Sequence, residues 1–316
     1  MIDTVVVGGG MTGISCARAL SDAGREVLVL DKGRGLGGRM ATRRVTLDGK
    51  DATFDHGAQY IGATAPDVAA MLDGLPDASA EWHDGAARPH HVGLPGMSGL
   101  PRALAQGIET RQGTNAAALH PIPDGWRITT DTEMFEAARV VLTIPAPQVA
   151  GLIGADHPLV TPLKDVTMDP CLTLMAAFPR NAPRPFISRV DPDSTLAWIA
   201  QDSTKPGRAD HVTTWIAQAA PGWSLRHVDD APEDIAARML PLLCAAIGTD
   251  PDNALYAAAH RWRYAHVATA LNRDFLRSDD ARLYLGGDWC LGPRVEAAWQ
   301  SGTAIARDIL ERNDAG

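Results

Sequence analysis

The 316-residue chain has only four cysteines, Cys16, Cys171, Cys244 and Cys290, and none of them belongs to a C-x-x-C pair. This spacing argues against a disulfide framework or a zinc site and is typical of reduced thiols in a cytoplasm. No apolar run approaches the roughly 18 residues that a membrane helix needs. We therefore expect a cytoplasmic protein with no membrane partner. Because a strand pattern begins within the first three residues, we also expect no signal peptide.

Positive charge is scarce as well. The formal net charge is -9 at pH 7, and the absence of a basic run argues against a nucleic-acid partner. The sequence also lacks the G-x-S-x-G, H-E-x-x-H and Walker motifs. The adjacent pair His90 and His91 has no helical partner for a metal site, so we expect no metal. A bound cofactor must then carry the chemistry, and we assign no catalytic side chain.

Residues 2–31 carry the strongest signal that is present. An apolar run, Ile2 to Val7, leads into G-x-G-x-x-G at Gly8, Gly10 and Gly13, then a helical pattern and a second apolar run ending at Asp31. This order is the dinucleotide-binding fingerprint. The first glycine permits the tight turn, the second lets the backbone approach a pyrophosphate, and the third allows close helix packing. Asp31 is placed to accept hydrogen bonds from a ribose diol; the alternative is a purely structural turn.

Two segments after Asp31 are unusual for a simple dinucleotide domain. Residues 32–40 form a glycine-rich loop in which Arg39 follows two glycines, an arrangement that suits a second phosphate. Arg39 could instead be a solvated loop charge. Residues 55–60 mix small and polar side chains, so this segment either lies against a flat ring or only ends a strand.

Hydrophobic periodicity predicts the remaining elements. Residues 260–266 are denser in polar rings and guanidinium groups than a core strand requires, which favours a pocket wall. The tryptophans Trp198, Trp215, Trp223 and Trp262 are interpreted as core or cavity walls. Strands are expected over 43–47, 51–54, 111–119, 126–130, 139–144, 172–178, 195–199, 212–217 and 281–285, and helices over 232–247 and 295–310.

The motifs at 8–13, Asp31, 37–40 and 55–60 together resemble the FAD-binding half of the flavin amine oxidase superfamily, most closely the renalases and their bacterial relatives. The resemblance resumes at 95–101, 262–265 and 284–290. It implies an α/β fold with a Rossmann-like FAD-binding domain and an intertwined α+β substrate domain. The FAD-binding domain is expected over 1–61, 97–157 and 276–316, and the substrate domain over 62–96 and 158–275.

The same resemblance implies noncovalent FAD, since the region from 260 to 280 has no cysteine for attachment. Asp288 would bind the ribityl chain, and the N–H groups near Val295 and Glu296 would face the edge of the flavin where negative charge collects. The expected cofactor residues are Gly8, Gly10, Thr12, Gly13, Asp31, Lys32, Gly38, Arg39, Met40, His56, Gly57, Ala58, Thr110, Gly287, Asp288, Val295, Glu296 and Ala298. The expected substrate residues are Gln59, Tyr60, Met97, Ser98, Arg263 and Trp289.

Two reactions are open within this resemblance. Amine oxidation commonly uses a lysine near flavin N5, but this chain has only four lysines, and Pro170 or Cys171 stands where that lysine is expected. The renalase-type reaction oxidises the 2- and 6-dihydro isomers of NAD(P)H, with oxygen as the acceptor, and removes no N–H or O–H proton. It suits a chain with no obvious base. A dinucleotide and oxygen are then the partners, and the oligomeric state is open. A redox-dependent binding protein and a desaturase are the alternatives outside this pair.

Overall fold

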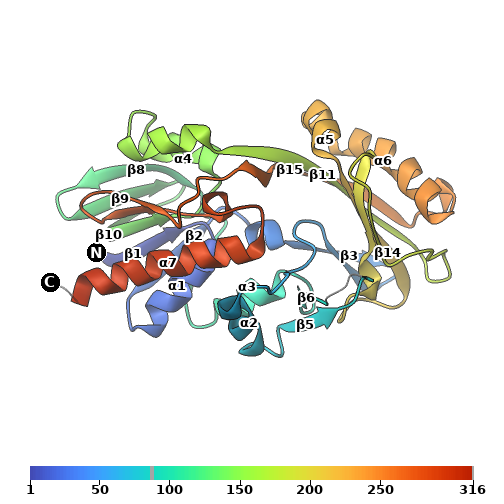
Figure 1. The fold of residues 1–316 in the computed structure, drawn as a ribbon, viewed down its shortest axis with the longest axis horizontal. Coiled ribbons are helices and arrows are strands. Elements are labelled where there is room, and N and C mark those ends of the chain that lie inside the picture. Colours follow the sequence, from blue (N-terminus) through green and yellow to red (C-terminus); the bar gives the residue numbers. More distant parts are fainter. Residues whose placement is uncertain (86–88, 315–316) are drawn as a thin grey trace. The chain divides into compact units, whose positions relative to one another are not determined.

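A computed structural model describes residues 1–85 and 89–314 of the chain. The chain forms two compact units, each assembled from separate segments (Figure 1). Unit 1 contains residues 1–38, 101–168 and 267–316, and unit 2 contains residues 39–100 and 169–266. Within the described ranges, no helix is both long and apolar enough to cross a membrane.

Unit 1 is built on an eight-stranded sheet. At its centre β1 (Ile2–Val7) runs parallel to β2 (Val27–Asp31) on one side and to β10 (Met134–Leu142) on the other. β7 (Glu109–Gln112) and β17 (Leu283–Leu285) extend the parallel part beyond β2 and β10. The central strands carry apolar runs over residues 5–7, 27–30 and 140–142, because both faces of the sheet are covered there. The antiparallel members are β8 (Ala116–Ile122), β9 (Gly125–Thr130) and β16 (Leu276–Arg277).

Two helices cover one face of this sheet. α1 (Met11–Asp22) and α7 (Val295–Asp314) lie side by side (Figure 1). Their close approach depends on Gly302, because a Cβ placed there would overlap Ser15 Oγ and the carbonyl of Thr12. Only a residue without a side chain allows the two backbones to pack at this distance.

The other face of the sheet carries the main apolar core of unit 1. Val5 and Leu30 of the parallel strands share one buried cluster with Leu119 of β8 and Ile128 of β9. α4 (Ala146–Ile153) adds Ala146 and Val149 to the same cluster. The shorter elements of this part of the chain are α3 (Gly99–Leu104), η2 (Pro158–Asp165) and η5 (Asp288–Cys290).

Unit 2 contains a five-stranded sheet in the order β12-β13-β14-β11-β15. α6 (Pro232–Ile247) places Ile235, Met239 and Leu243 on one side of the helix, and these residues pack against Leu174 and other residues of the sheet. The helix covers one face of the sheet because its apolar positions recur at helical spacing. The strands are β11 (Thr167–Pro179), β12 (Ser188–Val190), β13 (Leu196–Gln201), β14 (Val212–Ala219) and β15 (Tyr256–Thr269).

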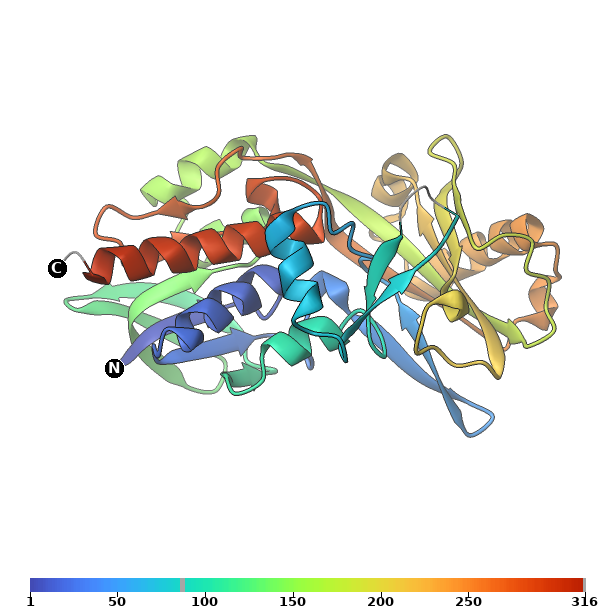
Figure 2. The same cartoon turned by 60° about the horizontal axis from the view of Figure 1, so that its bottom comes forward.

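A hairpin contributes the second buried cluster of unit 2. β3 (Thr42–Leu47) pairs with β4 (Lys50–Asp55), and the hairpin appears in Figure 2 as the blue ribbon ending in a tight turn. Phe54 of β4 is fully buried with Met175 and Ile216 of the sheet. The remaining elements are η1 (Gly38–Met40), α2 (Pro66–Asp73), β5 (Ser79–Trp82), β6 (His90–Gly93), η3 (Asp202–Thr204), α5 (Pro221–His227) and η4 (Pro251–Asn253).

Most expected elements are confirmed, including the helix over 232–247, but one strand is not. Residues 111–119 do not form a single strand. Gly113 has a φ of 69°, which separates β7 from β8, so the two strands pair with different partners, β2 and β9.

The compact units also divide at other places than the expected domains. Residues 39–61 and 97–100 belong to unit 2, because the hairpin packs Phe54 into the core of that unit. Residues 158–168 and 267–275 belong to unit 1, where Val160, Leu163 and Val267 join its core. The functional labels of the two domains remain expectations.

The contact at Gly302 generates a stability prediction. Gly302→Ala should lower the free energy of unfolding by about 1–3 kcal/mol, because the added methyl overpacks the α1–α7 contact. Gly151→Ala is the matched control: it lies exposed in α4, and a Cβ there meets no atom within 4 Å. The control should be neutral or stabilising by up to about 1 kcal/mol. Urea unfolding measures the free energy of unfolding of both variants. Equal free energies would show that α1 and α7 can separate without cost.

Candidate functional site

The carboxyl ends of the parallel strands in unit 1 form the first part of the candidate site. β1 ends at Val7 and leads into Gly8, which has a φ of 115° and donates its N–H to Leu30 O at 2.8 Å. A Cβ on Gly13 would overlap the carbonyl of Gly8, so the helix approaches the strand as closely as the fingerprint requires. Ligands of open parallel sheets bind at this edge.

The start of α1 offers a cradle for an anion. Gly10 precedes the helix and provides no side-chain cap, so no side chain occupies the N–H groups of the first turn. A Cβ built on Gly10 meets no atom within 4 Å, and a ligand could take up this open space. Backbone N–H groups and the helix dipole both favour a pyrophosphate here. Thr12 is buried in the same turn.

Asp31 is held rigidly at the end of β2. Its Oδ2 accepts from Gly9 N at 2.5 Å, and its Oδ1 accepts from Gly33 N at 2.6 Å. Each carboxylate oxygen keeps a further lone pair, so the pair of ribose hydroxyls can still be accepted. Two further residues are expected to bind the cofactor here. Lys32 Nζ lies 3.5 Å from Gln148 Oε1, and Thr110 pairs with Val29 inside the sheet.

The turn after β17 supplies the remaining cofactor candidates of unit 1. Gly287 N donates to Ser301 Oγ at 3.1 Å, which ties the turn to α7. Asp288 is buried directly after it. α7 then begins at Val295, with Glu296 buried and Ala298 half-buried in its first turn. Asp288 and this helix start are the expected ribityl and flavin contacts.

Trp289 does not have the expected position. Its side chain is 0% exposed, its indole N–H donates to Ile144 O at 3.0 Å, and the ring lies in the apolar core of unit 1. The interpretation of this ring as a wall for a stacked nicotinamide is therefore wrong. The ring turns inward because burial stabilises a large apolar surface while the carbonyl satisfies its N–H.

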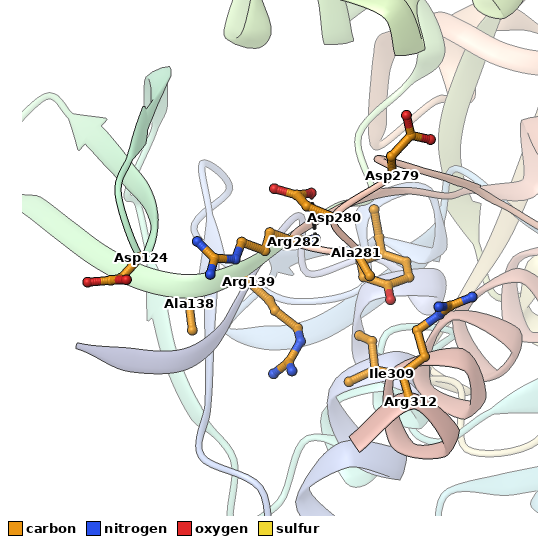
Figure 3. Close-up of a pocket in the computed structure, with 10 residues that line it drawn as sticks. Asp124, Ala138, Arg139, Asp279, Asp280, Ala281, Arg282, Ile309 and Arg312 are labelled. Atoms are coloured by element: carbon orange, nitrogen blue, oxygen red, sulfur yellow. Dashed lines mark hydrogen bonds between the residues drawn. The ribbon is translucent and has the colours of Figure 1, made fainter. Parts of the chain in front are cut away.

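A different edge of unit 1 carries a surface hollow of about 390 Å³ (Figure 3). Arg139 of its wall pairs with Asp3 at 2.8 Å, near the start of β1, and Asp280 Oδ1 accepts from Arg282 N at 3.1 Å. The hollow thus lies at the amino ends of the strands, away from the glycine turn. This is the edge at which parallel sheets do not bind ligands, so it is not the site.

In unit 2 the segment 55–60 turns beside Arg39. A Cβ on Gly57 would overlap the carbonyl of Arg39, and Ala58 N donates to that carbonyl at 2.7 Å. Arg39 also donates from its guanidinium to Ala265 O at 3.1 Å. Gly38 and Met40 stand on either side of Arg39 in η1, and Met40 is buried. Within unit 2, the structure thus brings together Arg39, Met40, His56, Gly57 and Ala58.

Three rings gather at the start of this segment, and we call them the ring cluster. His56 lies 4.6 Å from His260 and 5.3 Å from Trp262 between ring centroids, and His260 lies 4.3 Å from Trp262. The Trp262 indole N–H donates to His56 O at 2.7 Å, which fixes the ring from β15 against the segment. His260 is half-buried, so part of the cluster faces solvent. The density of polar rings over 260–266 was the sequence signal for it.

Both histidines of the ring cluster are neutral at pH 7. The pKa of His56 is lowered to about 4, mainly by burial, with the charges of His260 and Arg43 contributing to the lowering. Burial likewise lowers the pKa of His260 to about 4, with Arg43 and Arg261 contributing. His56 Nδ1 is buried and has no hydrogen-bond partner in the described chain. The His56 and Trp262 rings stack at 25° to each other, whereas His260 meets them edge-on at 80° and 60°. Neutral ring faces and an unsatisfied ring nitrogen suit a flat ligand.

A buried charge cluster that the sequence analysis missed lies beneath this segment. Lys205 Nζ is 3.2 Å from Asp55 Oδ2 and 2.7 Å from Asp202 Oδ1. Arg208 also pairs with Asp55 and lies 3.8 Å from Asp202 Oδ2. All four side chains are at most 1% exposed. Two acids and two bases cancel, which is what allows this burial. The scarcity of lysine was a signal, but nothing in the sequence related residue 205 to residue 55.

The charges within this cluster shift each other's protonation. Burial alone raises the pKa of Asp55, but Lys205 and Arg208 outweigh it and hold the pKa below its usual value. Met97 N and Thr42 Oγ1 donate to Asp55 Oδ1 at 2.9 and 2.7 Å and add to this effect. Asp55 therefore stays ionised and joins the hairpin to the segment that carries Met97.

Several expected substrate residues serve this cluster instead. Gln59 donates to Gly57 O at 2.9 Å and to Asp55 O, and accepts from Lys205 Nζ at 3.0 Å. Met97 is 0% exposed, and Ser98 is buried with its N–H donating to Thr42 Oγ1. The expectation that Gln59 and Met97 meet a substrate is therefore wrong for this geometry, because both side chains are enclosed in unit 2.

Two expected substrate residues lie nearer the surface. Tyr60 is half-buried and stacks on His90, with 3.7 Å between ring centroids. Arg263 is exposed and pairs with Asp229 at 2.6 Å. Along β15 alternate side chains point to opposite faces, so Arg263 points away from the rings of His260 and Trp262. Binding of a substrate phosphate by Arg263 stays a prediction.

The fold and these sites define a dinucleotide-binding flavoprotein, and comparison with known proteins is more specific. Residues 6–75 match an NAD(P)-binding Rossmann-like domain, and residues 75–310 match the flavin containing amine oxidoreductases. The chain belongs to the flavin-containing amine oxidoreductase family. It is an FAD-dependent oxidoreductase, and the open space at Gly10 and the held carboxylate of Asp31 fit that cofactor.

Among curated proteins, the chain is similar to (S)-6-hydroxynicotine oxidase of Paenarthrobacter nicotinovorans, with 41% identity over 83 residues. The match covers 25% of this chain and 19% of that protein. A putative flavin-containing monoamine oxidase of Mycobacterium tuberculosis is 36% identical over 107 residues, which cover 31% of this chain and 22% of that protein. These alignments thus span less than a quarter of either relative.

Solved structures share the fold over the whole chain. Cyclohexylamine oxidase from Brevibacterium oxydans matches with a TM-score of 0.76 and 13% identity, covering 99% of both chains. Putrescine oxidase bound to putrescine matches with a TM-score of 0.72 and 13% identity, covering 98% of this chain and 99% of that one. At such identity the likeness establishes the fold alone.

The position of Asp31 leads to a prediction on FAD binding. Asp31→Ala removes a charged acceptor of the ribose diol, at a cost of roughly 1.5–3 kcal/mol, so FAD should bind at least about tenfold more weakly. Asp22→Ala, an exposed aspartate at the end of α1, is the control and should bind FAD like the wild type.

Titration of the apoprotein with FAD, followed by fluorescence quenching, measures this affinity. Acid precipitation of the wild type should first release the flavin into the supernatant. Flavin retained in the pellet would contradict noncovalent binding, and equal affinities of both variants would show that Asp31 only ends a strand.

The buried charge cluster leads to a second prediction. Lys205→Met leaves Asp202 and Asp55 sharing one cation and should cost about 3–5 kcal/mol of unfolding free energy. Lys50→Met, in the exposed turn of the hairpin, should change it by less than about 0.5 kcal/mol.

Adding Asp202→Asn to Lys205→Met removes the surplus negative charge and should recover part of the loss. Urea unfolding of all three variants decides the matter. A Lys205→Met protein as stable as the Lys50→Met protein would show that the cluster contributes nothing.

Proposed function

We propose that this chain oxidises the 2- and 6-dihydro isomers of NAD(P)H to NAD(P)+, with oxygen reduced to hydrogen peroxide. The observation that carries the proposal is the ring cluster of His56, His260 and Trp262, a group of neutral rings in stacked and edge-to-face contact that is partly open to solvent. A nicotinamide ring can stack on a single ring face of this cluster, and aromatic pairs add about 0.5–1.5 kcal/mol beyond their buried area.

The FAD, when bound, supplies the redox chemistry by accepting a hydride at N5 and passing electrons to oxygen. The part of this chain is to bind the substrate, aim it and exclude water. A dihydropyridine that loses hydride becomes an aromatic cation and releases no N–H or O–H proton. The protein therefore needs no general base, and the two neutral histidines suffice as a stacking surface.

The distribution of ionisable groups supports this reading. The chain has four lysines, all described, and only Lys205 is buried. Its ammonium group is enclosed between Asp55 and Asp202, so it does not act on a substrate in this arrangement. The ring cluster thus lacks both an amine base and an uncompensated carboxylate that would attract an ammonium ion.

Oxidation of a small amine or polyamine is the second candidate. The family itself favours it, and so do the names of relatives such as the putative monoamine oxidase and the putrescine oxidase. Trp262 and the histidine rings could also flank an amine that arrives uncharged. The identity of the substrate, oxygen as the electron acceptor and a cytoplasmic location are proposals for this chain.

Anaerobic mixing separates the two reactions. Holoenzyme is mixed with the 2- and 6-dihydro isomers, with ordinary 4-dihydro-NADH and with a panel of amines, while flavin absorbance is followed. We expect rapid bleaching with the isomers and slow or no bleaching with the others. Bleaching by amines within seconds, with none by the isomers, would replace this proposal by amine oxidation.

A variant tests the role of the ring cluster. His260→Ala should retain FAD but reduce the rate of flavin reduction by the isomers by about tenfold, since lost stacking and alignment cost about 1–2 kcal/mol. His120→Ala, an exposed histidine of β8, is the control and should react like the wild type. Equal rates of flavin reduction in the two variants would show that the ring cluster takes no part in the reaction.

A further inference from the structure

Arg43 lies on the hairpin face that packs against the sheet of unit 2. It is directly opposite Phe54 in the β3–β4 register, and directly opposed residues share a face of the hairpin. Phe54 is fully buried in that face, and Val45 and Leu47 pack against the same apolar cluster. Arg43 continues this row on β3, where a further apolar residue would extend the core.

Strand β15 packs against the hairpin face that carries Arg43 and Phe54. The Tyr256 ring of β15 lies 5.4 Å from the ring of Phe54. Further along β15 the same face carries His260 and Trp262, which contact His56, the residue two positions after Phe54. Arg43 therefore borders the ring cluster. Its charge helps to lower the pKa of both His56 and His260, as expected of a guanidinium group close to both rings.

The guanidinium group of Arg43 has no acceptor in the described chain. The side chain is exposed, and no carboxylate or carbonyl lies within hydrogen-bond distance of it. Its neighbour Arg44, which points to the opposite face of the hairpin, lies 3.9 Å from Asp51. Arg261 donates to Val228 O, and Arg263 pairs with Asp229. Of these arginines, Arg43 alone combines a place beside the rings with open hydrogen-bonding capacity.

We propose that Arg43 binds a phosphate group of the substrate and sets the preference for an anionic dinucleotide over an ammonium substrate. The inference rests on the proposed function and adds the residue that recognises its substrate class. A guanidinium group forms forked hydrogen bonds to a phosphate while a nicotinamide stacks on the adjacent rings. The same fixed positive charge disfavours an ammonium ion at this place.

Comparison of Arg43→Gln with Arg44→Gln tests the proposal. For the dihydro isomers of NADH, the half-saturating concentration in anaerobic flavin reduction should rise about tenfold in Arg43→Gln and stay unchanged in Arg44→Gln. The limiting rate should change less than about twofold, because a phosphate contact holds the substrate without taking part in hydride transfer. Arg43→Lys keeps the charge without the fork and should fall between wild type and Arg43→Gln.

A substrate without phosphate gives the sharper readout. The corresponding isomers of dihydronicotinamide riboside should reduce wild type and Arg43→Gln with equal half-saturating concentrations. If the half-saturating concentration in Arg43→Gln rises equally for the riboside and the dinucleotide, Arg43 acts on the nicotinamide end and not on a phosphate, and the proposal is overturned. A fall in limiting rate with an unchanged half-saturating concentration would overturn it too.

Binding of NAD+ to oxidised holoenzyme, measured by calorimetry, separates this inference from the proposed function. If the dihydro isomers fail to reduce the wild type, the proposed function fails. Weaker NAD+ binding by Arg43→Gln than by Arg44→Gln would still support an anion site at Arg43. Equal NAD+ binding by the two variants overturns the inference. This holds also if Arg43→Gln has a lower half-saturating amine concentration than Arg44→Gln, because the inference requires an effect on NAD+.

Discussion

Unit 2 depends on the burial of Asp55 together with Lys205, Arg208 and Asp202. A single buried carboxylate would be strongly unfavourable, and the arrangement holds because two cations compensate two anions with close contacts. Asp55 also accepts from Met97 N and Thr42 Oγ1, so one carboxylate ties three segments distant in sequence. The segment with His56 and Gly57 follows directly from it. The buried charge cluster therefore fixes the position of His56 in the ring cluster.

Unit 1 rests on a different constraint, the close approach of backbones. Gly13 against the carbonyl of Gly8, and Gly302 against that of Thr12, leave no room for a side chain. Together they fix the start of α1 beside the end of β1 and hold α7 alongside. The open space at Gly10 results from the same geometry: where the protein excludes its own side chains, a pyrophosphate can approach the N–H groups.

The electrostatics of the two units differ in a way that bears on substrate choice. In unit 2 the buried acids Asp55 and Asp202 are paired with Lys205 and Arg208. The histidines beside Trp262 are neutral because burial depresses the pKa of each. Arg43, whose guanidinium group has open hydrogen-bonding capacity, adds a positive charge at the border of these rings. Family membership establishes a flavin-dependent oxidoreductase, whereas the choice between an amine and a dihydronicotinamide depends on the charge around the rings. The proposed role of Arg43 assigns that choice to the anionic substrate.

Local signals determined most of the fold and the cofactor edge. The glycine spacing at Gly8, Gly10 and Gly13, the run that ends at Asp31 and the helical period over 232–247 act over a few neighbouring residues, so the sequence alone specified them. Side-chain environment was not determined in this way. Trp289 follows a cofactor motif yet points into the core, and Arg263 stands in a polar stretch yet points away from the rings. Lys205 meets Asp55 across 150 residues, a pairing with no local sequence pattern. Tertiary structure alone decided these positions, because burial and charge compensation depend on which segments pack together.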